Sequence, residues 1–540
     1  MQNEDKMNSV LLPIEMYKIA GMKCFDMAQA MASLYYNRNY ELMFLDCWNF
    51  EYNESQPLQE DIIGKYISQG KCNINENLLK FHGIETIEVK SIEKKQIFNY
   101  IMDKLHSNMP VFLWYDQYYM PWTKEIRRQE LLRYNGYIMI IGYDISQQFF
   151  YCIDIHGTQK REILPWKDFM DFVYTQQSIN CYIYMKRPIN CEINVEYYLS
   201  HLKEQVEDTK KDYFNLFQQM HNAAAEIKQQ FNFEQEIKYT IEFINKQLTA
   251  PTQVPMVTAL IDVARMRSLY ALSLTYIGKK VNDTEFIDFA NQFRLLYAEW
   301  QMLVSILIKA FYKKDFKDLQ NKIADGIVKI AREEEKVYYK MVHKDKDIKL
   351  PLKKENSNKS NINKTYVYCD LKEYINNCGF KTKYLERQQA DFDGLGNYFI
   401  CCENLKEISL KNIRYKLNID IYDNIKCKAQ TILVEKALYK EIGILGACDS
   451  GGFFGKLEIF YDDKHKEEQI FGLGEWRFEK CEFGEQVIWV GDRYYFGNVN
   501  DEEKGYLFSY IIKLHSNRQI EQIKLPDCPN MHIFGITLIR

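Results

Sequence analysis

The spacing of hydrophobic residues changes twice along the chain. The first region begins with one segment of helical spacing, residues 23–36, and continues with short apolar runs bounded mostly by Gly, Pro, Asp or Asn, which is typical of strands. These runs cover residues 109–115, 137–143, 149–153 and 181–185. A helix followed by a sheet predicts an α+β domain over residues 1–190.

The following regions have patterns of their own. Over residues 193–342 glycine nearly disappears and apolar residues recur three or four positions apart, which predicts a bundle of about five helices. Residues 343–364 are rich in Lys, Asn and Ser, and we expect them to form an exposed linker. Residues 365–540 contain many short apolar runs between turn residues, which predicts a β-sandwich or jelly roll. The chain is therefore predicted to be a multidomain α+β protein.

Composition narrows the possible partners. The net charge is −4, from 70 basic and 74 acidic residues, so we expect no nucleic-acid partner. No window reaches about 18 uncharged apolar residues and the N-terminus lacks a secretory pattern, so we expect no membrane span and a cytoplasmic location. The 14 cysteines form no CxxC pair and the 9 histidines are scattered, which predicts free thiols and no metal site. Phosphate- and dinucleotide-binding motifs are absent, and no cofactor is expected.

Cys24 is the strongest candidate for a reactive group. It falls in the first turn of the helix predicted over residues 23–36, where free backbone N–H groups and Lys23 favour a thiolate. This position predicts a lowered thiol pKa and a nucleophile whose base and orienting acid come from later strands. The alternative is a small buried cysteine on the core face of the helix.

Two stretches near the N-terminus carry a family resemblance. The first is GMKC at residues 21–24, and the second is MPVFLWYDQYYMPW at residues 109–122, followed by YIMIIGYD at residues 137–144 and by Asp154. With these motifs the chain resembles the N-terminal domain of butirosin biosynthesis protein H and its relatives, which look like papain-like cysteine peptidases. The resemblance covers about residues 10–340, because a helical module follows this domain in the family. Residues at matching places here are Arg265, Arg267, Tyr270 and Trp300.

The resemblance implies a cysteine acyltransferase. Cys24 would take an acyl group from a carrier-protein or peptide thioester, an amine acceptor would resolve the new thioester, and Asp154 would orient the base. The family's base is a His about six residues before Gly-Tyr-Asp, but this chain has Asn135 and Gly136 there. Neither residue can act as a general base near neutral pH. His156, two residues after Asp154, is either a displaced base or a turn residue.

Three further residues complete the candidate site. We expect Asp116 and Tyr119 to line the cleft beside Cys24, with Asn135 as a third substrate-binding candidate; the alternative for Asp116 is a cap of the turn that follows it. The resemblance and the missing His together predict a degenerate cysteine acyltransferase of secondary-metabolite biosynthesis, of the nonribosomal peptide or aminoglycoside type. The alternative is a non-catalytic protein that binds a carrier protein or a peptide in such a pathway.

The C-terminal region carries a second resemblance. The sequences DSGGFFGKLEIFYDD at residues 449–463, GEW at 474–476 and LPDCPNMHIF at 525–534 resemble a galactose-binding-like β-sandwich, and the similarity covers residues 365–540. Sugar sites combine aromatic faces with polar groups, and core packing is the alternative role for the aromatic residues. The aromatic candidates are Trp476, Trp489, Tyr494 and Tyr495.

Overall fold

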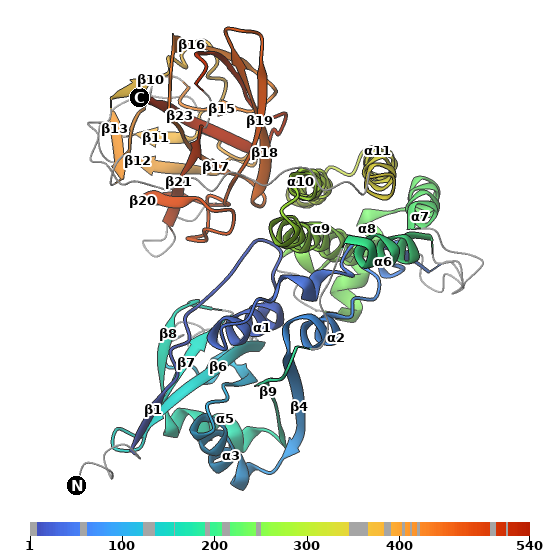
Figure 1. Ribbon diagram of the computed structural model, residues 1–540, viewed down its shortest axis with the longest axis vertical. Helices are drawn as coiled ribbons and strands as arrows, with labels where there is room; N and C mark the ends of the chain where they lie inside the picture. The colour runs from blue at the N-terminus through green and yellow to red at the C-terminus, as the bar shows by residue number, and fades with distance from the viewer. Residues whose placement is uncertain are drawn as a thin grey trace. The chain divides into compact units, whose positions relative to one another are not determined.

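The computed structural model divides into two compact units (Figure 1). Unit 1 contains Met1–Cys47 and Lys71–Ser200, and unit 2 contains Trp48–Gly70 and His201–Arg540. The structure describes residues 8–53, 62–122, 135–155, 157–189, 195–207, 216–244, 250–344, 365–382, 390–401, 405–410, 413–417, 422–496, 504–514 and 517–540. The predicted linker therefore lies almost entirely outside the described residues, and the predicted domain boundaries stay predictions.

Unit 1 is built on an antiparallel sheet with the strand order β4-β9-β5-β6-β7-β8, and β1 pairs with β6. The four apolar runs predicted as strands are confirmed as β5, β6, β7 and β9. The strands are β1 (Ser9–Leu11), β4 (Ile84–Ile92), β5 (Val111–Asp116), β6 (Asn135–Asp144), β7 (Phe149–Asp154), β8 (Arg161–Pro165) and β9 (Ile179–Lys186). The helices are α1 (Cys24–Tyr35), α2 (Ile74–Asn77), α3 (Lys94–His106) and α5 (Trp166–Thr175).

Helices lie on both faces of this sheet. Phe25 of α1 packs its ring against Phe112 of β5, with ring centroids 5.4 Å apart. Phe172 of α5 packs against Tyr115 of the same strand, at 4.4 Å. Side chains alternate between faces along a strand, and Phe112 and Tyr115 are three residues apart. Helix α1 therefore covers one face of the sheet and α5 covers the other.

The predicted helical region is confirmed. It contains α6 (Val195–Glu207), α7 (Leu216–Gln230), α8 (Phe233–Tyr239), α9 (Pro255–Val281), α10 (Thr284–Lys313) and α11 (Leu319–Val342). At its centre, Arg267 of α9 makes two hydrogen bonds to Glu334 of α11, at 2.8 and 2.9 Å, and neither side chain is exposed. The indoles of Trp48 and Trp300 donate to the same carboxylate, at 2.7 and 3.0 Å. Arg267 and Trp300, two residues of the family resemblance, thus have a structural role here.

The C-terminal region is a β-sandwich, as predicted. One sheet has the order β10-β23-β17-β21-β20-β12-β11, with β15 on β23, and a second has the order β16-β22-β18-β19. The first sheet contains β10 (Tyr366–Tyr368), β11 (Phe380–Thr382), β12 (Tyr398–Cys401), β15 (Ile425–Lys426), β17 (Glu441–Cys448), β20 (Gln486–Tyr494), β21 (Lys504–Lys513) and β23 (Met531–Ile539). The second contains β16 (Thr431–Ala437), β18 (Phe453–Tyr461), β19 (Lys466–Leu473) and β22 (Ile520–Lys524). A separate pair is formed by β13 (Glu407–Leu410) and β14 (Ile413–Lys416).

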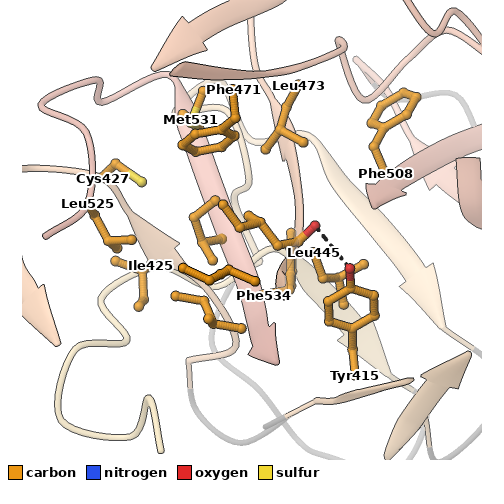
Figure 2. Packing of buried hydrophobic residues seen from close by; sticks show 14 of the residues in the cluster. Tyr415, Ile425, Cys427, Leu445, Phe471, Leu473, Phe508, Leu525, Met531 and Phe534 are labelled. Carbon is orange, nitrogen blue, oxygen red and sulfur yellow. Dashed lines mark hydrogen bonds between the residues drawn. The ribbon is translucent and has the colours of Figure 1, made fainter. Parts of the chain in front are cut away.

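Residues of both sheets meet in one apolar core (Figure 2). Leu445 and Phe534 come from the first sheet, and Phe471 and Leu473 come from the second. Tyr415 reaches this core with its ring, and its hydroxyl donates to the carbonyl of Ile444 at 3.4 Å, so its polar atom is satisfied (Figure 2). Strands β17 and β23 at the centre of the first sheet are buried along almost their whole length, as continuous apolar runs of the sequence predict.

Candidate cysteine site

Cys24 opens α1, as the sequence predicts. The backbone N–H of Lys23, the residue before the helix, donates to Asp26 at 2.9 Å and fixes the first turn. Burial raises the pKa of the Cys24 thiol, and the charges of Asp154 and Asp26 raise it further. Its own backbone N–H and the charge of Lys18 act in the opposite direction but do not outweigh burial. The predicted lowering of the thiol pKa is therefore wrong, because desolvation exceeds the effect of the helix terminus.

The carboxylate of Asp154 is fully buried at the end of β7. It accepts hydrogen bonds from the indole Nε1 of Trp122 at 2.9 Å and from the backbone N–H groups of Gly157 and Thr158 at 2.8 Å each. A Cβ at position 157 would lie 2.5 Å from this carboxylate, so a larger residue there would displace it. Asp154 thus caps the turn after β7. It also accepts a hydrogen bond from the indole N–H of Trp122, and the N–H of an imidazole could have donated to it in the same way.

The register of β6 and β7 decides which face each residue shares. Ile138 pairs with Asp154, and Gly136 pairs with Tyr115 of β5. Directly paired residues of an antiparallel sheet point to the same face, so position 136 and Asp154 lie on the face that α5 covers. Tyr137 points to the α1 face, where its ring stacks on Phe112 at 5.0 Å. The place expected for the base thus shares a face of the sheet with Asp154, whose charge acts on the Cys24 thiol.

The remaining predicted site residues have local partners. Asp116 accepts a hydrogen bond from the backbone N–H of Tyr118 at 3.0 Å, which matches the turn-cap alternative. The ring of Tyr119 lies 6.1 Å from that of Phe172, and its carbonyl accepts from the Tyr115 hydroxyl at 3.4 Å. Their substrate-binding roles stay predictions.

Two candidates fall outside the described part of the chain. The side chain of Asn135 is one of them, although its backbone pairs with Asp116. His156 is the other, so its role as a displaced base stays a prediction.

Trp122 and Tyr137 are site residues that the sequence argument missed. Both belong to the stretches that carry the family resemblance, but nothing in their spacing indicated a contact with Asp154 or with Phe112. An indole that lies 32 positions from its acceptor is visible only in the folded chain.

The aromatic residues of the sandwich fall into two groups. Trp476 is fully buried, and Trp489 packs against Phe380 at 5.3 Å, so both serve the core. Tyr494 stacks on Tyr398 of the neighbouring strand, at 4.7 Å and 6°. Among the described residues no group of three or more His, Cys, Asp or Glu side chains is arranged to hold a metal ion. In the same part of the chain, no helix is both long and apolar enough to cross a membrane.

Comparisons with known proteins bear on the C-terminal region. A family model of the AziU2-like beta-sandwich domain matches residues 374–540, in agreement with the sandwich seen there. No curated protein matches the chain. One solved structure, "A novel family GH115 4-O-Methyl-alpha-glucuronidase, BtGH115A, with specificity for decorated arabinogalactans", aligns with 64% of this chain at 8% identity and a TM-score of 0.14. The alignment spans 38% of that enzyme's chain, and a TM-score this low does not indicate a shared fold.

Proposed function

We propose that this chain is a degenerate cysteine acyltransferase of secondary-metabolite biosynthesis, whose N-terminal unit holds an acyl thioester or a peptide at Cys24 and transfers the acyl group slowly. The resemblance of residues 21–24, 109–122 and 137–144 to the butirosin biosynthesis protein H family supports the reaction class. The AziU2-like name of the C-terminal domain is a second pointer to such a pathway.

The observation that carries the proposal is the environment of Asp154. Its carboxylate is engaged by Trp122, Gly157 and Thr158, and no imidazole occupies the place expected for the base. In an intact site the base removes the thiol proton, the thiolate attacks the thioester carbonyl, and the carrier thiol leaves with a proton. A positioned base accelerates such a step roughly 10²–10⁴-fold, so we expect acylation here to be slower by about this factor. Burial of Cys24 slows acylation further, because burial raises the pKa of the thiol.

Acyl transfer to the intact protein tests the proposal. The chain is incubated with an acyl N-acetylcysteamine thioester, and acylation is followed by intact mass. We expect slow acylation that Cys24→Ala abolishes and Cys72→Ala leaves unchanged, since Cys72 is a second half-buried thiol of unit 1. Rapid acylation that depends on Cys24 would refute the degenerate site, and acylation that ignores Cys24 would refute the site itself.

Installing a base sharpens the test. Tyr137 lies on the face of α1, whereas Gly136 lies on the opposite face. Gly136→His brings an imidazole to the face of Asp154, whose charge acts on the Cys24 thiol, and we expect it to accelerate acylation. Tyr137→His, which points to the other face, is the matched control and should give no gain.

A non-catalytic binding protein is the second candidate. The raised pKa of Cys24 and the capped carboxylate of Asp154 favour it, because both lower the reactivity of the site. If neither the natural chain nor Gly136→His becomes acylated, binding of a carrier protein or peptide is the remaining activity. Asp116→Ala and Tyr119→Ala would then be tested for loss of that binding.

A further inference from the structure

Helix α10 presents a row of side chains to the β-sandwich of the same unit. The hydroxyl of Tyr297 donates to the carbonyl of Gly452 at 3.3 Å. Further along the helix, the ring of Tyr312 lies 4.6 Å from that of Phe496. Ser305 and Lys309 make polar contacts between these two positions. Helix positions three and four apart share a face, so these contacts follow one side of α10 for about four turns.

The centre of this contact is polar and buried. Asp449 is fully buried, and its carboxylate accepts from Asn530 Nδ2 at 2.6 Å and lies 3.1 Å from His532 Nε2. Lys309 of α10 completes the cluster with an ion pair to Asp449 at 2.8 Å. Asn530 also donates to the hydroxyl of Ser305 at 2.8 Å. Helix α10 thus supplies a partner to each of these two sandwich residues: Lys309 to Asp449 and Ser305 to Asn530.

The charge of Asp449 depends on these partners. Burial alone would raise its pKa, but the hydrogen bond to His532 and the charge of Lys309 outweigh burial and lower the pKa to about 2. A buried carboxylate that loses its cation is strongly disfavoured. The sandwich thus has a group whose ionised state is supported by a residue of the helix.

Apolar packing surrounds the polar centre. Ala298 of α10 belongs to the core cluster of the sandwich, and Tyr297 packs its ring against Phe454 and Phe483, at 5.9 and 6.4 Å. The loop that approaches the helix is tightly shaped: a Cβ on Gly452 would lie 2.3 Å from the ring of Phe483. Hydrophobic contacts supply attraction and the buried polar groups supply register, as in specific interfaces.

We propose that this end of the sandwich, formed by residues 449–454 with Phe496 and Asn530, is a helix-binding surface, that α10 of the same chain is its occupant, and that the two remain bound when the chain between them is cut. With α10 in place, this end of the sandwich is closed to sugars, peptides and carrier proteins. Any partner of the sandwich must use another of its surfaces.

Cutting the connection tests the proposal in the full chain. A specific protease site is inserted within residues 345–364, the protein is cleaved, and the two halves are analysed by size exclusion and by dilution. We expect the halves to elute together. Lys309→Met should weaken their association roughly tenfold to a hundredfold, because it leaves Asp449 without its cation. Lys313→Met, an exposed position one turn further along α10, is the matched control and should change nothing.

Each outcome decides the proposal. Separation of the natural halves at micromolar concentration overturns it, and so does equal affinity of the Lys309→Met and Lys313→Met proteins. If uncut Lys309→Met shows a lost circular dichroism signal, Ser305→Ala replaces it, since this change removes one acceptor on the helix and leaves the sandwich sequence untouched. A several-fold weaker association then supports the proposal, and an unchanged one overturns it.

Discussion

Glu334 in the helical bundle and Asp154 beside the cysteine site are both fully buried carboxylates, and each accepts a hydrogen bond from an indole. They differ in the groups that stabilise their negative charge. Glu334 receives two hydrogen bonds from the buried guanidinium of Arg267, whereas Asp154 is held by backbone N–H groups of its own turn. The first arrangement joins three helices and a distant loop, while the second stabilises one turn and positions one aromatic ring.

This difference affects how reactive each region can be. An ion pair that is closed on all sides serves stability or specificity and leaves no group to react. A carboxylate held by dipoles keeps its charge near the thiol, and that charge raises the pKa of Cys24. Asp154 therefore opposes thiolate formation, because its negative charge raises the pKa of the thiol.

The largest expected effect comes from removing the charge of Glu334. Glu334→Gln leaves the guanidinium of Arg267 buried without its anion, so we expect the free energy of unfolding to fall by about 3–5 kcal/mol. Urea unfolding measures the loss. Glu333→Gln, an exposed neighbour that pairs with Lys336, should change stability by less than about 0.5 kcal/mol. Equal effects of the two substitutions would contradict a structural role for the buried pair.

A third buried carboxylate, Glu236, shows how backbone N–H donors act on the pKa when both oxygens accept from them. Its two oxygens accept from the backbone N–H groups of Gly64 and Met256, at 2.7 Å each, and burial raises its pKa to about 7 despite these bonds. Between the ordinary pKa and pH 7 the folded chain keeps a proton that the unfolded chain has released. The contribution of this group to stability therefore falls as pH rises through that window, by up to about 3 kcal/mol, and is constant above it.

Urea unfolding at pH 5 and pH 8 measures this dependence. Glu236→Gln cannot titrate, so its stability should change less between the two pH values than that of the natural chain. An unchanged pH dependence in the variant would show that Glu236 is not the titrating group.

Asp154 should give a smaller effect than Glu334. Asp154→Asn replaces one accepting oxygen by an NH₂ group, which faces N–H donors, and we expect a loss of about 1–3 kcal/mol. Trp122→Phe removes one donor and should lower stability by about 1 kcal/mol. In the double variant the two losses should be less than additive, because they share one hydrogen bond. Additive losses would contradict the contact, and Asp171→Asn, at an exposed position of α5, is the control.

The smallest expected effect concerns the thiol itself. Because burial raises the pKa of Cys24, its alkylation by iodoacetamide should keep increasing above the pH range of an ordinary cysteine. Lys18→Met should shift the profile further toward high pH, since the charge of Lys18 lowers this pKa. Peptide mass mapping assigns the rate to Cys24, with the urea-unfolded chain as the reference. A midpoint below pH 7 would contradict the effect of burial.

Much of the fold could be predicted from local patterns. The apolar runs that became β5, β6, β7 and β9, the helix that begins at Cys24 and the β-rich C-terminal region follow from spacing that neighbouring residues set by themselves. The cysteine site was predicted less well. Its members could be named from motifs, but the state of the thiol and the partners of the carboxylate depend on burial and on contacts between distant segments.

The sequence by itself determined where helices and strands form, that a histidine is missing at positions 135–136, and that Cys24 opens a helix. Only the tertiary structure decided that position 136 faces away from α1, that Trp122 binds Asp154, and that Ser305 meets Asn530 across 225 positions of the chain. The physical reason is the distance along the chain over which each effect acts. Periodicity and turn residues act over a few residues, whereas desolvation, strand register and buried polar pairing depend on which segments pack together.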